Sequence, residues 1–134
     1  MKQTLAMISI TAALIFGSIG AVVAADFDAG FAAYQKGDYA LALREWTPLA
    51  EQGDAGAQLV LGGMYHNGHG VSQDDKTAAK WFVLAAEQGH AVAQFSLGVM
   101  YRKGQGVSQN YKTAAKWFRL AAEQGDAAAQ FNLG

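Results

Sequence analysis

The amino-acid sequence predicts an all-α fold, a solenoid of antiparallel helix pairs. The first observation is an internal repeat, because residues 54–89 and 90–125 align without a gap and 25 of the 36 positions are identical. Repetition at a period of this size is typical of solenoids, whose units stack because none buries its apolar face alone. The second is composition, since 51% hydrophobic residues and a single proline favour a packed helical body over a disordered chain.

The remaining composition excludes several classes of function. Charged residues make up 16% of the chain and the formal net charge is −1, so we expect no nucleic-acid partner, which would require a basic stripe. The chain has no cysteine, which excludes a disulfide framework, a thiol nucleophile and a cysteine zinc site. The glycine pairs Gly68-x-Gly70 and Gly104-x-Gly106 lack the third glycine and the lysine of phosphate-binding loops, so we expect no cofactor.

Residues 1–25 have the composition of an export signal. Lys2 provides a positive start, residues 5–23 are almost wholly apolar, and two small residues, Ala24 and Ala25, precede Asp26. This pattern predicts a signal peptide cleaved after Ala25 and a periplasmic or secreted mature chain with no stable membrane span. The alternative is an uncleaved anchor helix, because residues 5–25 are just long enough to cross a bilayer.

Residues 26–53 are predicted to form a degenerate repeat that caps the N-terminal end of the solenoid. Phe27, Phe31 and Tyr34 follow the spacing of one helix face. Gly37 then supplies a turn, and a second helix ends in the same Ala-Glu-Gln-Gly sequence as the full units. Pro48 lies inside that second helix and should bend its last turn.

Each full unit, residues 54–89 and 90–125, is predicted to be a helical hairpin. In the first unit we expect Asp54 to cap a helix over 55–66 and Ser72 to cap a second helix over 73–88. A loop with two glycines, Gly68 and Gly70, joins the helices.

The apolar face of the second helix is predicted to form the core. Trp81 and Phe82 keep the helical period of an inward face, and Gly62 leaves room for one of them to approach the first helix. We expect replacement of Trp81 or Trp117 by alanine to lower the free energy of unfolding by about 3–5 kcal/mol, the range for a buried large aromatic.

Residues 126–134 restart the repeat and are predicted to be the beginning of a further unit. We expect the natural chain to continue beyond Gly134; the alternative is that this segment folds back over the third unit. A third possibility is self-association through the uncovered apolar residues Phe131 and Leu133.

The motif shared by the two copies resembles a known repeat family. It consists of Ala-Gln-x-x-Leu-Gly-x-Met-Tyr-x-x-Gly-x-Gly-Val, then Lys-x-Ala-x-x-Trp-Phe, then Ala-Ala-Glu-Gln-Gly. This pattern resembles the Sel-one-like repeat, a relative of the tetratricopeptide repeat, over all of residues 54–125. The resemblance implies a tetratricopeptide-like right-handed superhelix that serves as a scaffold for protein partners, and bacterial members that are often exported. It implies no chemistry by itself.

The positions that differ between the copies indicate where a partner binds. Four of the eleven unmatched positions are spaced 4, 3 and 4 residues apart on the first helix, which indicates one solvent-facing stripe. In tetratricopeptide-like stacks the first helix lines the concave groove, so the resemblance implies that this stripe is the partner-binding face. The predicted contact residues are Val60, Asn67, Ser96, Val99, Arg102 and Lys103.

Arg102 and Lys103 form a local basic pair with two interpretations. One is that the pair grips an acidic or C-terminal carboxylate group, because arginine forks onto carboxylates. The other is that both are solvated charges at a helix end, favoured by the helix dipole.

Enzymatic interpretations find little support in the sequence. His66 and His69 are three residues apart, but the second copy keeps neither, so we predict no metal site. The nearest approach to the Ser-x-x-Lys motif of penicillin-binding serine enzymes is Thr77-x-x-Lys80, and it recurs in both copies as a helix face would. We therefore predict no enzymatic activity.

Together these patterns predict an exported, non-enzymatic repeat scaffold. It would bind a protein or peptide partner in a concave groove lined by the first helix of each repeat. The alternative is an accessory region of a cell-envelope enzyme or cell-wall-binding protein whose active region lies beyond Gly134.

Overall fold

The structure, a computed structural model, describes residues 24–133 of the chain. This part consists of helices without strands, which confirms the predicted all-α solenoid. The predicted signal peptide falls on residues 1–23, outside the described residues, apart from its last two positions. The helices are α2 (Phe27–Gln35), α3 (Tyr39–Glu51), α4 (Ala55–Asn67), α5 (Asp75–Glu87), α6 (Ala91–Lys103), α7 (Tyr111–Glu123) and α8 (Ala127–Leu133).

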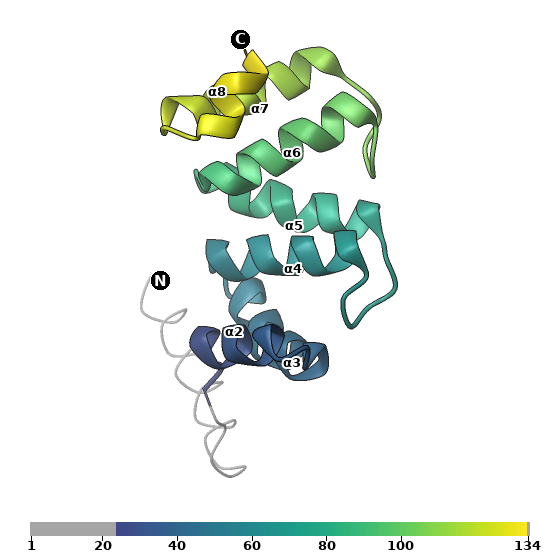
Figure 1. The fold of residues 1–134 in the computed structure, drawn as a ribbon, viewed down its shortest axis with the longest axis vertical. Coiled ribbons are helices and arrows are strands. Elements are labelled where there is room, and N and C mark those ends of the chain that lie inside the picture. Colours follow the sequence, from purple (N-terminus) through teal and green to yellow (C-terminus); the bar gives the residue numbers. More distant parts are fainter. Residues whose placement is uncertain (1–23, 134) are drawn as a thin grey trace, which may run out of the picture.

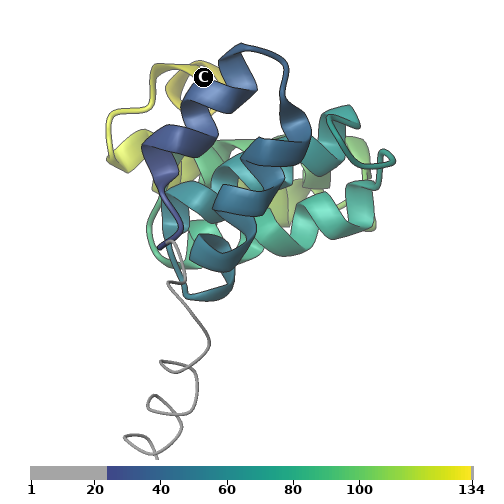
Figure 2. The ribbon, with the colours of Figure 1, turned by 90° about the horizontal axis from the view of Figure 1, so that it is seen from below.

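The helices stack in chain order. Figure 1 shows them following one another along the long axis, from α2 near one end to α8 at the other. Figure 2, seen from below, shows the helices of successive pairs lying over one another. Each helix packs mainly against the helices before and after it in the sequence. No helix within residues 24–133 combines the length and the apolar character that crossing a bilayer requires.

The core is divided into three clusters along the stack. Each cluster joins the second helix of one unit to the first helix of the next, and each contains one buried large aromatic residue. These residues are Trp46, Phe82 and Phe118, and successive ones are 36 positions apart. Because every cluster depends on two units, stacking itself buries the apolar surface, as expected of a solenoid.

Glycines on the first helices allow these aromatic rings to approach closely. A Cβ atom at Gly62 would lie 2.6 Å from two ring carbons of Phe82, and one at Gly98 would lie 2.7 Å from the ring of Phe118. The predicted close approach is therefore made by Phe82.

Trp81 and Trp117 are half-buried, not part of the fully buried core. Trp81 packs against the cluster of Trp46, and Trp117 against the cluster of Phe82, one unit back. The predicted loss of 3–5 kcal/mol for a buried large aromatic therefore applies to Phe82 and not to the tryptophans. Periodicity places the adjacent residues Trp81 and Phe82 on one apolar stripe, but in the stacked units only Phe82 is fully buried.

The helix caps agree with prediction at Asp54 and differ at Ser72. The Asp54 side chain accepts the N–H of Ala57 at 2.7 Å, as expected. The second helix, however, begins at Asp75, because Asp74 is the cap and accepts both the N–H and the hydroxyl of Thr77, at 3.2 and 2.7 Å. These bonds from Thr77 hold the pKa of the Asp74 carboxyl below its usual value.

The loop explains why Ser72 is not the cap. The backbone N–H of Asp74 donates to the carbonyl of Tyr65 at 2.9 Å, which ties the loop back to α4 and sets the start of α5. Asn110 caps α7 in the equivalent place and accepts the N–H of Thr113 at 3.0 Å. Ser72 therefore remains an exposed loop residue.

Candidate partner-binding face

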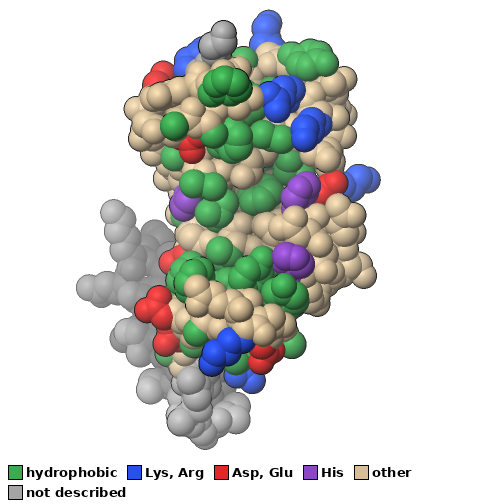
Figure 3. Space-filling view, viewed as in Figure 1, with side chains coloured by type: hydrophobic (Ala, Val, Ile, Leu, Met, Phe, Trp, Pro, Cys, Tyr) green, Lys and Arg blue, Asp and Glu red, His purple; other side chains and the backbone are tan. Residues whose placement is uncertain are grey.

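The first helices of the units carry a series of hollows. Figure 3 shows hydrophobic side chains gathered along the middle of the molecule, over α4 and α6, with histidine side chains at the edges. Three hollows lie along the first helices, and we call the surface that they share the hollow-bearing face.

The first hollow lies between α2, α3 and α4. Its volume is about 210 Å³. The lining residues are Phe31, Tyr34, Trp46, Val60, Gly63 and Asn67. Two of them, Val60 and Asn67, belong to the predicted contact residues.

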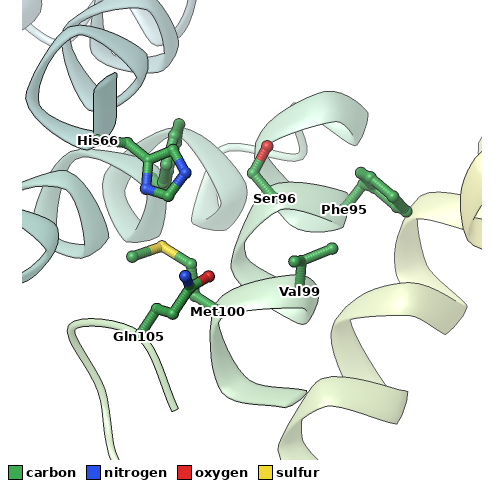
Figure 4. A pocket seen from close by; sticks show the side chains of 7 residues that line it. His66, Phe95, Ser96, Val99, Met100 and Gln105 are labelled. Carbon is green, nitrogen blue, oxygen red and sulfur yellow. The ribbon is translucent and has the colours of Figure 1, made fainter. Parts of the chain in front are cut away.

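The second hollow lies one unit further along and has a volume of about 170 Å³. Its lining consists of His66, Phe82, Phe95, Ser96, Val99, Met100 and Gln105. Figure 4 shows His66, Met100 and Gln105 on one side of the hollow, and Phe95, Ser96 and Val99 on the other. His66 Nδ1 is hydrogen-bonded to Asp75 Oδ1 at 2.8 Å, and the Ser96 hydroxyl donates to the carbonyl of Val92 at 2.9 Å.

The third hollow lies between α6, α7 and α8 and has a volume of about 210 Å³. It is lined by Arg102, Tyr111, Ala114, Ala115, Phe118 and Asn132. The guanidinium of Arg102 lies over the ring of Phe118, 5.5 Å from its centroid, and donates to the side-chain oxygen of Asn132. A cation over an aromatic face is a favourable contact that holds the arginine side chain in place.

The three hollows occupy equivalent positions in successive units. The aromatic residues at their base are Trp46, Phe82 and Phe118. One wall is formed by Val60, Ser96 and Asn132, and successive members of each set are 36 positions apart. The solenoid thus repeats one kind of hollow. The lining side chains become more polar from the first hollow to the third.

The structure brings five of the six predicted contact residues to these hollows. Val60 and Asn67 line the first, Ser96 and Val99 the second, and Arg102 the third. Lys103, the last residue of α6, is exposed and lines none of the three. Of the predicted basic pair, Arg102 lines a hollow and Lys103 does not.

Other lining residues were missed by sequence reasoning, which considered only positions that differ on the first helix. The base of each hollow comes from the second helix, where Phe82 and Phe118 are identical in the two copies. Phe31 and Tyr34 come from the N-terminal cap, which does not align with the full units. The signal that could have found the bases of the hollows is the 36-residue spacing of Trp46, Phe82 and Phe118. No such signal marks Phe31 and Tyr34.

The two histidines of the considered metal pair have separate partners. His66 bonds to Asp75, whereas His69 Nδ1 is 2.8 Å from the hydroxyl of Tyr34 and its ring stacks on Tyr39 at 4.7 Å. Burial raises the pKa of the Tyr34 hydroxyl, and the neighbouring Tyr39 adds to this effect. Residues 24–133 contain no group of three or more His, Asp or Glu side chains that could hold a metal ion.

A fourth, larger hollow lies between α5 and the loop from α6 to α7. Its volume is about 480 Å³, and we call it the α5 groove. It is lined by Lys76, Ala79, Lys80, Val83, Leu84, Gly106 and Val107. None of these residues belongs to the first helices, so the α5 groove lies apart from the hollow-bearing face.

The chain is a helical-repeat protein of the solenoid class. Its helix pairs repeat every 36 residues, its core is divided into clusters along the stack, and equivalent hollows recur from one unit to the next. The sequence profile of the Sel1 repeat matches residues 55–90 and 91–126. The chain therefore belongs to the Sel1 repeat family, as its resemblance to the Sel-one-like repeat indicated.

Solved structures of the same family resemble this chain. A Sel1 repeat protein from Oxalobacter formigenes is 38% identical with a TM-score of 0.77, and the match covers 81% of this chain and 44% of that one. The c5321 protein, a protective antigen present in uropathogenic Escherichia coli strains and displaying an SLR fold, is 37% identical with a TM-score of 0.74, over 80% of this chain and 24% of that one.

A more distant match is the cysteine rich protein B of Helicobacter pylori. It is 27% identical with a TM-score of 0.66, and the match covers 68% of each chain. The chain spans less than half the length of the first two structures. A search of curated protein sequences found no match. Sel1 repeats commonly mediate protein–protein interaction, and proteins built from them are typically non-catalytic scaffolds.

Proposed function

We propose that this chain is an exported, non-enzymatic scaffold that binds a protein or peptide partner on its hollow-bearing face. The observation that carries the proposal is the series of three equivalent hollows, each based on a large aromatic residue. We take this face to be the concave groove that the resemblance implied. Its binding contacts are then Val60, Asn67, Ser96, Val99 and Arg102, with Lys103 at the rim.

The size of the hollows favours a macromolecular partner. Their volumes are about 170 to 210 Å³, whereas pockets for small molecules and cofactors are typically about 300–1,000 Å³. One hollow therefore accommodates a single side chain rather than a whole ligand. A chain that presents several side chains in series can use all three at once.

The stacked helices also favour binding energetically. The hollows are lined by residues of packed helices, so a partner meets a surface that is already formed. Ordering loops and side chains at an interface reduces affinity, and a preorganised surface avoids much of that loss.

A cross-linking pull-down from an envelope extract tests the proposed face. The bait is the wild-type chain beside a triple variant, Asn67→Ala, Arg102→Ala and Lys103→Ala. The control variant is Leu84→Ser, which changes the α5 groove at a side chain that is 44% exposed. We expect a partner that the wild type and the control capture and the triple variant loses. Loss in the Leu84 variant alone would move the site to the α5 groove.

Export is proposed from residues 1–25, and the mature N-terminus tests it. We expect the protein recovered from the periplasm or medium to begin at Asp26, as measured by intact mass. A protein that keeps residues 1–25 and stays with the membrane fraction would support the anchor alternative instead.

Self-association through α8 is a separate possibility. The side chain of Phe131 is 85% exposed at this end of the described chain. An exposed aromatic residue of this kind is a candidate contact for a second copy. Sedimentation of a monomer whose mass does not change with concentration would exclude this possibility.

A further inference from the structure

The two full units differ at a pair of equivalent positions close to the second and third hollows. In the unit of residues 54–89, His66 and Asp75 are hydrogen-bonded to each other at 2.8 Å. Thirty-six residues later the same positions hold Arg102 and Tyr111, both of which line the third hollow. A polar pair that is satisfied within its own unit is thus replaced by a permanent cation and a phenol.

Arg102 has donors that its own chain does not use. Among the described lysine and arginine side chains, the one in a salt bridge is Arg44, which pairs with Glu45, so Arg102 has no carboxylate partner of its own. Its guanidinium is held over the Phe118 ring and donates to the oxygen of Asn132. A guanidinium has five N–H donors in a rigid fork, so most of them remain available to a ligand.

The neighbours of Arg102 favour an anion with acceptor oxygens. The side-chain N–H of Asn132 donates to the carbonyl of Ala128 at 2.7 Å, which orients the amide oxygen toward Arg102. The hydroxyl of Tyr111 accepts a hydrogen bond from Gln109 at 3.0 Å and keeps its own proton to donate. Tyr111 is 67% exposed, so a partner can reach this hydroxyl.

We propose that the third hollow is a carboxylate subsite that takes an aspartate or glutamate side chain of the partner. This inference rests on the proposed function, and it specifies a partner with apolar side chains for the first two hollows and an acidic one for the third. Arg102 contacts the carboxylate through its fork, and Tyr111 donates a further hydrogen bond. The partner group is a side chain because the hollows repeat along the stack, and each receives one side chain of the same bound segment.

Peptide binding to the full chain tests this subsite. The probes are labelled ten-residue peptides, acetylated and amidated at their ends, with two leucines and one glutamate at varied separations. Each has a twin with glutamine in place of glutamate, and a third form combines glutamine with a free C-terminal carboxylate. Fluorescence anisotropy gives Kd, and NMR shifts of the hollow-lining residues locate the bound peptide.

We expect the glutamate peptide of matching separation to bind about tenfold tighter than its glutamine twin, because a hydrogen bond to a charged group is stronger than one between neutral groups. In the Arg102→Gln variant, the Kd values of the glutamate peptide and its glutamine twin should lie within about twofold of each other. Lys112→Gln, which removes an exposed cation of α7 that does not line the hollow, should keep most of the difference. Tyr111→Phe alters only an exposed hydroxyl, so it tests the subsite without disturbing the packing of Arg102 on Phe118, and it should reduce the preference.

Four outcomes overturn the inference. If the twins bind wild type equally and shift the hollow residues, the acid subsite is wrong and the proposed function stands. The subsite is also wrong if the acid preference survives Arg102→Gln. If the peptide with the free C-terminal carboxylate binds more tightly than the glutamate peptide, the hollow takes the end of a chain and not an acidic side chain. If no peptide of the set binds or shifts a hollow residue, both the subsite and the proposed peptide-binding face fail.

Discussion

Replacement of Gly62 by alanine tests how tightly the second helix of a unit is packed against the first. A Cβ atom at this position would lie 2.6 Å from two ring carbons of Phe82, whereas ordinary van der Waals contacts are 3.4–4 Å. The ring would therefore have to retreat by about 0.8 Å. Phe82 is only 5% exposed, so a retreat of the ring, even into the second hollow that it lines, breaks packing contacts with its core cluster.

Two opposing effects set the magnitude. Inserting a methyl group into a packed core lowers stability by about 1–3 kcal/mol, and we take the upper end because Phe82 is buried. Alanine in place of glycine inside a helix raises stability by about 1 kcal/mol. We therefore expect Gly62→Ala to lower the free energy of unfolding by about 2 kcal/mol, which corresponds to a decrease in Tm of roughly 10 °C.

Gly63 provides a matched control in the same helix. A Cβ atom there would have no neighbour within 4 Å, so Gly63→Ala should raise the free energy of unfolding by about 0.5–1 kcal/mol. Because the helix-propensity gain is common to both variants, the difference between them isolates the clash with Phe82. Urea unfolding followed by circular dichroism measures both. Stabilities of the two variants within about 0.5 kcal/mol of each other would refute the packing argument.

Three further predictions concern the caps and the aromatic residues. His90 holds the N-cap position of α6 but makes no side-chain cap bond, and its buried Nδ1 has no hydrogen-bond partner. His90→Asp should therefore raise the free energy of unfolding by about 1 kcal/mol relative to His90→Ala, and equal stabilities would contradict this. Asp74 has a lowered pKa in the folded chain, so its stabilising contribution is present above its ordinary pKa and is lost as the pH falls below about 4. Asparagine at position 74 can still cap the helix but does not titrate. The free energies of unfolding of wild type and Asp74→Asn should therefore converge as the pH falls through that range, and a difference that stays constant with pH would show that the Asp74 carboxyl does not contribute to the pH dependence. Phe82→Ala should lower the free energy of unfolding by about 3–5 kcal/mol and half-buried Trp81→Ala by clearly less, and the reverse order in urea unfolding would mean that the indole is the core residue.

The fold was predictable because its information is local and repeated. The 36-residue identity predicts the helix pairs, and glycine spacing predicts the close approach at Gly62. What periodicity could not decide is which of two adjacent apolar residues points inward, since Trp81 and Phe82 share one stripe and stacking selects between them. The start of α5 at Asp75, after the cap at Asp74, was missed for a similar reason, because it depends on a bond to Tyr65 across the loop.

The candidate site was only partly predictable because each hollow is assembled from more than one unit. Differences between the copies led to Val60 and Ser96, which lie on the first helices. The bases of the hollows and the partner of Arg102 come from other helices. The contact between Arg102 and Asn132 joins residues 30 positions apart in different units, and no short pattern in the sequence marks it.

Site-specific photo-cross-linking tests the central claim, that a partner binds the hollow-bearing face, most directly. One protein carries a photoreactive phenylalanine analogue at Asn67, an exposed residue of the first hollow, and the other carries it at Leu84 in the α5 groove. Both are irradiated with the best-binding peptide of the probe set, and the cross-linked mass is measured. We predict a cross-link from Asn67 and none from Leu84. A cross-link from Leu84 alone would contradict the assignment and place the binding surface on α5.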